Sequence, residues 1–143
     1  MLLIPMNWWA VLASVILFQV IGSLWYSPFL FGKKWMSLMG VTPEKMQDAK
    51  KEKVKMVKQY SVNIFSSLIL TYAMAVFVSY SVVATIPSGI LIALVLWIGF
   101  VATTNAMEYI WNVNNKPWEL YFINTGYYLV AMIIVGIVLS LWS

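Results

Sequence analysis

The sequence contains no cysteine and no histidine, and this excludes several kinds of chemistry. The chain can form no disulfide, offers no thiol nucleophile, and lacks the usual ligands for zinc and copper. It also lacks the residue best suited to general-base catalysis at neutral pH. An enzyme is therefore the least favoured class, and we expect no cofactor and no metal centre. Acid–base chemistry would depend on five carboxylates alone: Glu44, Asp48, Glu52, Glu108 and Glu119.

Charge is also scarce, since 10% of the 143 residues are charged and 62% are apolar. A soluble domain of this size needs polar side chains over most of its surface. The surplus apolar surface has to face lipid instead, and four apolar segments are long enough to cross about 30 Å of hydrocarbon. The composition predicts an all-α integral membrane four-helix bundle, with one transmembrane domain over residues 1–143.

The spans are delimited by proline, glycine and polar residues. The first ends where Ser27-Pro28 disfavours further helix. It should be retained rather than cleaved, because Met1 to Met6 carry no basic segment of the kind that opens a signal peptide. Ala84 to Gly89, which contains Pro87-Ser88-Gly89, is expected to form a short turn before the third span. The four expected spans are residues 7–26, 61–83, 90–110 and 118–142.

Residues 29–60 are expected to form a loop and helix outside the bilayer. Phe29 to Gly40 combines aromatic residues with lysines, a composition suited to the headgroup region. Thr42 then provides an N-cap, with Pro43 in the first helical turn. Because no helix breaker follows, we expect one continuous helix from there to Val83, so that the second span extends into the cytoplasm.

The orientation follows from the basic residues, which are nine lysines on two alternate loops. Eight lie between the first two spans, and Lys116 lies between the last two. Since basic residues concentrate in cytoplasmic loops, we expect residues 27–60 and 111–117 in the cytoplasm and both termini outside the cell membrane. The lysine-rich helix is expected to lie near anionic lipids. Acidic residues interrupt the run, so no binding of nucleic acid is expected.

The two halves of the chain share a faint pattern. Tyr60-Ser61-Val62-Asn63 enters the second span, and Tyr121-Phe122-Ile123-Asn124 enters the fourth. The matched positions have the same depth and direction, as in a parallel repeat of helix pairs. A chance similarity is the alternative, because tyrosine is favoured at the membrane interface.

Five polar side chains in the spans are candidates for binding a solute, because an amide or carboxylate in lipid is costly unless it is paired, hydrated or used. Gln19 and Glu108 are expected to face one polar interior. The alternative for the amides is to hold helices together, and the alternative for Glu108 is an interfacial ion pair with Lys116. The five candidates are Gln19, Asn63, Thr104, Glu108 and Asn124.

Small residues at four-residue spacing allow helices to approach closely within or between chains. With the polar stripes they exceed what a single four-helix bundle has to bury, so a homo-oligomer is expected. The pairs are Ala10 and Ser14, Gly99 and Thr103, and Ala102 and Ala106.

Three aromatic segments carry a resemblance to a known family. Asn7-Trp8-Trp9 opens the first span, Trp25-Tyr26-Ser27-Pro28 followed by Phe31-Gly32-Lys33 closes it, and Phe122 to Val130 lies in the last. With these segments the chain resembles the bacterial membrane proteins catalogued as domain of unknown function 1761. The likeness covers nearly the whole chain. It implies four spans in a bacterial inner membrane and assigns no functional residue.

The favoured function is an oligomeric channel or transporter for a small cation or polar solute, because polar residues recur within the spans. The alternative is a structural or accessory membrane protein that recruits a partner through its lysine-rich helix. The Ser27-Pro28 segment has two interpretations as well, an interfacial corner or a lid over a cytoplasmic vestibule.

Overall fold

A computed structural model describes residues 5–112 and 114–143, which form helices and connecting turns with no strand among them. The all-α fold class is therefore confirmed. The expectations for Met1 to Ile4 and for Val113 lie outside the described residues. The elements in chain order are α1 (Trp8–Trp25), α2 (Gly32–Met39), α3 (Pro43–Lys51), α4 (Lys53–Tyr80), α5 (Ile86–Leu96), the π-helix η1 (Trp97–Ala102), α6 (Thr103–Ile110) and α7 (Trp118–Leu141).

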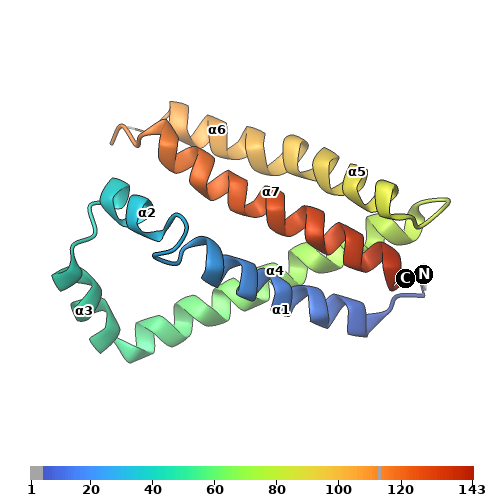
Figure 1. Ribbon diagram of the computed structural model, residues 1–143, viewed down its shortest axis with the longest axis horizontal. Helices are drawn as coiled ribbons and strands as arrows, with labels where there is room; N and C mark the ends of the chain where they lie inside the picture. The colour runs from blue at the N-terminus through green and yellow to red at the C-terminus, as the bar shows by residue number, and fades with distance from the viewer. Residues whose placement is uncertain (1–4, 113) are drawn as a thin grey trace.

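Four helical stretches are long and apolar enough to cross a membrane, as in a multi-pass membrane protein. They are α1, α4, α7 and the run of α5, η1 and α6. Figure 1 shows them as an elongated bundle with α2 and α3 at one end. We call this the lysine-rich end, because α2, α3 and the start of α4 carry eight of the nine lysines. At the opposite, terminal end, Asn7 Nδ2 donates to the Trp142 carbonyl oxygen at 2.8 Å.

The helix that follows Thr42 is not continuous, contrary to the expectation from the sequence. Thr42 caps it as predicted, accepting a hydrogen bond from the Lys45 amide at 3.2 Å. However, α3 ends at Lys51 and α4 begins at Lys53, with Glu52 between them at φ −85° and ψ 68°. No residue of α3 is buried. Since helices in proteins are stabilised mainly by packing, nothing here favours a straight continuation.

The third spanning helix begins earlier than expected, at Ile86. Pro87 lies in its first turn, where a missing N–H leaves no helical hydrogen bond unmade. Thr85 and Ser88 form a capping box there, each side chain accepting from the other residue's backbone N–H. The expected turn over residues 84–89 is therefore wrong from Ile86 on, and Gly89 belongs to the helix.

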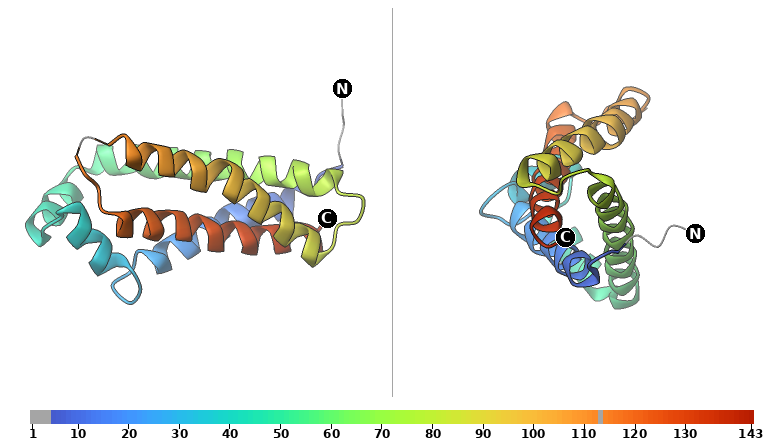
Figure 2. Two further views of the ribbon diagram at one scale, coloured as in Figure 1. Left: turned by 90° about the horizontal axis from the view of Figure 1, so that it is seen from above. Right: turned by 90° about the vertical axis from the view of Figure 1, so that its right-hand side faces the viewer.

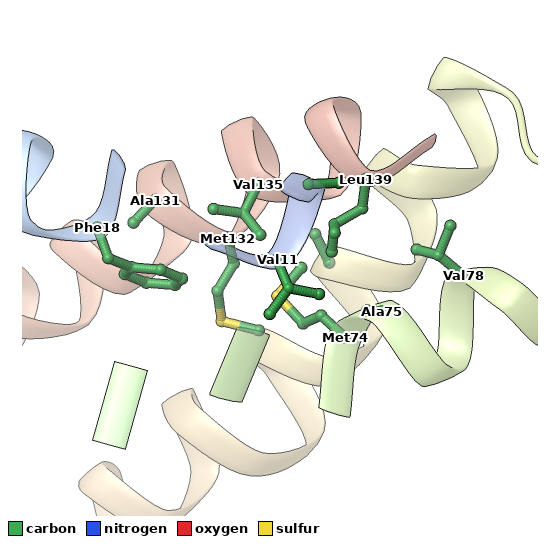
Figure 3. Close-up of a cluster of buried hydrophobic side chains, with 11 residues drawn as sticks. Val11, Phe18, Met74, Ala75, Val78, Ala131, Met132, Val135 and Leu139 are labelled. Carbon is green, nitrogen blue, oxygen red and sulfur yellow. The ribbon is translucent and has the colours of Figure 1, made fainter. Parts of the chain in front are cut away.

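The apolar core lies in the half of the bundle near the terminal end. Figure 3 shows side chains of α1, α4 and α7 meeting there. The core residues that are at most 2% exposed include Val11, Phe18, Met74, Val78 and Val135. In a membrane the acyl chains of the lipids are as apolar as the core, so burial of apolar side chains alone does not hold helices together. Close van der Waals packing of this kind does.

Helices α5 and α7 pack so closely at Gly89 and Gly136 that no side chain fits between them. A Cβ added at either glycine would collide with the backbone of the other. Ala93 and Ser140 continue this contact one turn further along each helix and are also buried. In contrast, η1 and α6 have no buried residue, and this stretch diverges from α7 in the left view of Figure 2. The bundle is tight at the terminal end and opens toward the lysine-rich end.

We predict that Gly89→Ala lowers the thermal stability of the purified protein, because overpacking a close contact costs about 1–3 kcal/mol. Gly99→Ala is the matched control, since an added Cβ there meets no atom within 4 Å. Thermal unfolding of both variants in the same detergent measures the difference. Equal midpoints for Gly89→Ala and the wild type would contradict the close approach of α5 and α7.

Candidate functional site

A cavity of about 540 Å³ lies between α1, α4, α6 and α7, toward the lysine-rich end. This volume falls within the roughly 300–1,000 Å³ of typical ligand pockets. Amides and phenols dominate its lining, and we call it the amide cavity. The lining residues are Phe18, Gln19, Gly22, Ser23, Tyr26, Tyr60, Asn63, Asn105, Asn124, Tyr127 and Tyr128.

One wall of the amide cavity joins α1 to α4. Gln19 Nε2 donates to Ser67 Oγ at 2.9 Å, and Asn63 Nδ2 donates to Gln19 Oε1 at 3.4 Å. Ser67 is 8% exposed and donates in turn to the Asn63 carbonyl oxygen at 2.9 Å. These contacts position both amides at the cavity, while Asn63 itself stays exposed.

The opposite wall joins the end of α1 to α7. Tyr26 Oη donates to Asn124 Oδ1 at 2.9 Å, and Trp25 Nε1 donates to the Ile123 carbonyl oxygen at 2.9 Å. The tight corner after Tyr26 brings Gly32 back onto the backbone of Tyr26 and Ser27, where an added Cβ would collide. The aromatic segment that carried the family resemblance therefore attaches α1 to α7.

A second cavity of about 480 Å³ lies between α2, α3, α6 and α7, and we call it the α2 cavity. Trp35 and Met36 of α2 line it, together with Lys116 from the loop before α7. Tyr26 and Asn124 line both cavities. The hydrogen bond between these two side chains thus stands between the amide cavity and the α2 cavity.

The π-helix η1 lies just before Asn105 in the chain, and its carbonyl oxygens accept hydrogen bonds from side chains. The Ala102 oxygen accepts from Tyr121 Oη at 2.9 Å, and the Gly99 oxygen accepts from Thr103 Oγ1 at 2.8 Å. Thr104 Oγ1 donates in the same way to the Phe100 oxygen, and Asn105 Nδ2 to the Val101 oxygen at 2.8 Å. Short π-helical turns occur frequently at functional sites.

The structure brings three of the five predicted site residues together. Gln19, Asn63 and Asn124 all line the amide cavity, although they come from α1, α4 and α7. Asn63 and Asn124 are also the matched positions of the faint repeat, but they have different partners, Gln19 and Tyr26. A true internal repeat stays a prediction.

Thr104 and Glu108 do not line this cavity. The Thr104 hydroxyl is bonded within its own helix, and the Glu108 side chain is 61% exposed with its Oε1 3.6 Å from Lys116 Nζ. The expectation that Glu108 and Gln19 share one polar interior is therefore wrong, and the alternative pairing with Lys116 is present. Successive helical residues are turned by about 100°. Asn105, the residue directly after Thr104, therefore points in another direction and lines the cavity.

Asn105, Tyr60, Tyr127 and Tyr128 are polar lining residues that the sequence did not indicate as binding residues. Asn105 is an amide within a span, the signal by which Gln19 was found. These three tyrosines carried no such signal, because tyrosine is common near membrane interfaces whatever it contacts. Tyr127, for example, does not face the membrane interface with its hydroxyl. The hydroxyl donates a hydrogen bond to the Phe18 carbonyl oxygen inside the bundle at 3.0 Å.

The family model for proteins of unknown function called DUF1761 matches residues 9–140. The chain belongs to this family. The resemblance inferred from the aromatic segments is thereby confirmed. No curated protein and no solved structure matches the chain.

The amide cavity of this DUF1761 protein offers neutral hydrogen-bonding groups. An asparagine side chain has two N–H donors and one carbonyl acceptor. Asn105 uses one donor on the Val101 oxygen, and the described residues provide no partner for its Oδ1. Among the residues described, none of those lining the cavity is ionised at neutral pH. The site is suited to an uncharged polar group that both donates and accepts hydrogen bonds.

Single cysteines test which surfaces water reaches, since the DUF1761 chain has none of its own. We predict that Ser23→Cys, in the amide cavity, reacts with a charged methanethiosulfonate reagent, because a hydrated thiol ionises. Ser14→Cys, at a position 0% exposed, should stay unlabelled. Ser66→Cys, in an apolar groove, should react slowly. If Ser66→Cys is labelled as fast as Ser23→Cys, the cavity is not a distinct hydrated site.

Proposed function

We propose that this DUF1761 protein is a small membrane transporter whose substrate presents an uncharged polar group to the amide cavity. The carrying observation is that Gln19, Asn63, Asn105 and Asn124 converge on one space from four helices. Polar residues within spans are costly, and they commonly mark a substrate pathway. The neutral lining favours a polar solute over the small cation that the sequence also allowed.

The α2 cavity supports an access route from the lysine-rich end. It lies under α2 and α3 and shares Tyr26 and Asn124 with the amide cavity. Side chains change rotamers far faster than helices move. A change of the χ1 rotamer of Tyr26 would move its hydroxyl away from Asn124, break this hydrogen bond and join the two cavities without separating the helices.

Glycerol is a suitable probe for the amide cavity, being small, uncharged and able to donate and accept hydrogen bonds. We expect saturation-transfer NMR on the protein in nanodiscs to detect glycerol binding. Replacing both Asn63 and Asn105 by leucine should abolish the signal. Leucine is similar in size to asparagine, so the change removes two amide groups from the lining and largely keeps its shape. Gln59→Leu is the control, an exposed position outside the cavity.

Equal glycerol signals in the wild type and the double leucine variant would contradict the proposal. Rubidium uptake into proteoliposomes gives the second readout. Uptake that is lost in Glu108→Gln but kept in the double leucine variant would support a cation path at Glu108 instead.

The orientation and the assembly are part of the proposal. We place the lysine-rich end in the cytoplasm, near anionic lipids, and the terminal end outside. Single cysteines at Lys53 and Ser88 should then label from opposite sides of intact cells, because they lie at opposite ends of the bundle. Labelling of Lys53→Cys from outside would reverse the orientation. The homo-oligomer stays a prediction.

A second candidate function is recruitment of a partner protein. Thr42 to Lys50 are all exposed, and no residue of α3 is buried. A short helix with no buried residue is marginal by itself, so a binding partner would stabilise it. Removal of α3 without effect on glycerol binding would separate this role from the amide cavity.

A further inference from the structure

An apolar groove of about 510 Å³ lies beside the amide cavity, between α4 and the stretch of α5 and η1. Leu70 and Phe77 of α4, Phe100 and Val101 of η1, and Met132 of α7 are among the residues that line it. Its residues are almost all apolar, with Ser66 the polar exception. The groove and the amide cavity together therefore form an amphipathic surface between helices.

Three helices connect the groove to the amide cavity within a single turn each. On α4, Asn63 lines the cavity and Ser66 lines the groove. On α6 and η1 the corresponding step is from Asn105 to Val101, and on α7 it is from Tyr128 to Met132. Residues three or four apart share one helix face, so each helix presents one stripe that changes from polar to apolar.

The length of the groove matches one leaflet of a membrane. Along α4 it extends from Ser66 to Phe77, which at 1.5 Å per residue is about 17 Å. The hydrocarbon of one leaflet is about 15 Å thick, half of the roughly 30 Å core. On the side of Asn63 toward the lysine-rich end, Tyr60 and Lys58 are exposed, and both residue types are typical of the headgroup level.

We propose that the substrate is a membrane lipid, with its hydroxylated head in the amide cavity and one acyl chain in the apolar groove. This inference rests on the proposed function, because it identifies the uncharged polar group as part of a lipid head. The lysines at this end attract anionic headgroups to the mouth of the cavity. A lipid satisfies both surfaces, whereas an apolar helix from a second copy would leave the cavity amides without hydrogen bonds.

The experiment uses the full chain in phosphatidylcholine nanodiscs that contain a small share of phosphatidylglycerol with a diazirine in one acyl chain. After illumination, mass spectrometry locates the cross-links. In the wild type they should concentrate on residues 66–77 and 96–101. Ala73→Trp, which fills the exposed groove, should reduce them about tenfold, while Ile16→Trp on the exposed face of α1 should leave them unchanged.

The double leucine variant at Asn63 and Asn105 is the second arm, since it leaves the groove intact. It should also reduce the groove cross-links at least about tenfold, because the head loses hydrogen bonds to two amides and a tenfold change corresponds to only about 1.4 kcal/mol. Random contact with surrounding lipid would not depend on these amides.

Three outcomes would overturn the lipid proposal. The first is cross-links spread evenly over the exposed faces, and the second is groove cross-links that persist in the double leucine variant. The third is efficient disulfide formation between two copies of Ala73→Cys, which would assign the groove to a second copy. If glycerol still binds through the amides in any of these cases, the proposed function stands and only the lipid assignment fails.

Discussion

The close contact between Gly89 of α5 and Gly136 of α7 is the constraint on which the rest of the arrangement depends. It places two helix backbones against each other at the terminal end, with Ala93 and Ser140 continuing the contact. The same stretch then runs on as η1 and α6, which have no buried residue. A π-helical turn is one of the recognised causes of a bend in a helix, so η1 accounts for a path that contacts α7 closely at one end and separates from it at the other. The amide cavity and the apolar groove occupy the resulting space beside α4.

Polar groups that face hydrocarbon need a partner, and the way in which they are paired distinguishes structural residues from candidate binding residues. The hydroxyls of Thr103, Thr104 and Tyr121 are bonded to carbonyl oxygens of η1, so they stabilise an irregular stretch of helix. The amides of Gln19 and Asn63 form a long 3.4 Å contact at the edge of a cavity. A side chain that has spare hydrogen-bonding capacity and lies at a cavity is available to a ligand.

Much of the fold follows from the sequence, because length and hydropathy decide which segments can cross a membrane. The start of α1 near Asn7, the Thr42 cap and the aromatic corner at Ser27-Pro28 all carry local signals that the structure matches. The break at Glu52 carries no such signal. It occurs because α3 has no buried residue that would hold it in line with α4, and the sequence does not show this. Pro87 led to the wrong prediction of a turn, because proline is common both in turns between helices and in the first turn of a helix.

The candidate site was only partly predictable for a similar reason. Residue type identifies an amide within a span, but it does not say which helix face meets a cavity. Thr104 and Asn105 are neighbours in the sequence, and a rotation of about 100° between them decides which one lines the amide cavity. The π-helical turn just before them changes that rotation further, and nothing in its apolar residues signals it. The position of Asn105 therefore depends on the π-helical turn that precedes it. In this protein the residues that shape the site and the residues that line it are separated along one continuous helix from Ile86 to Ile110.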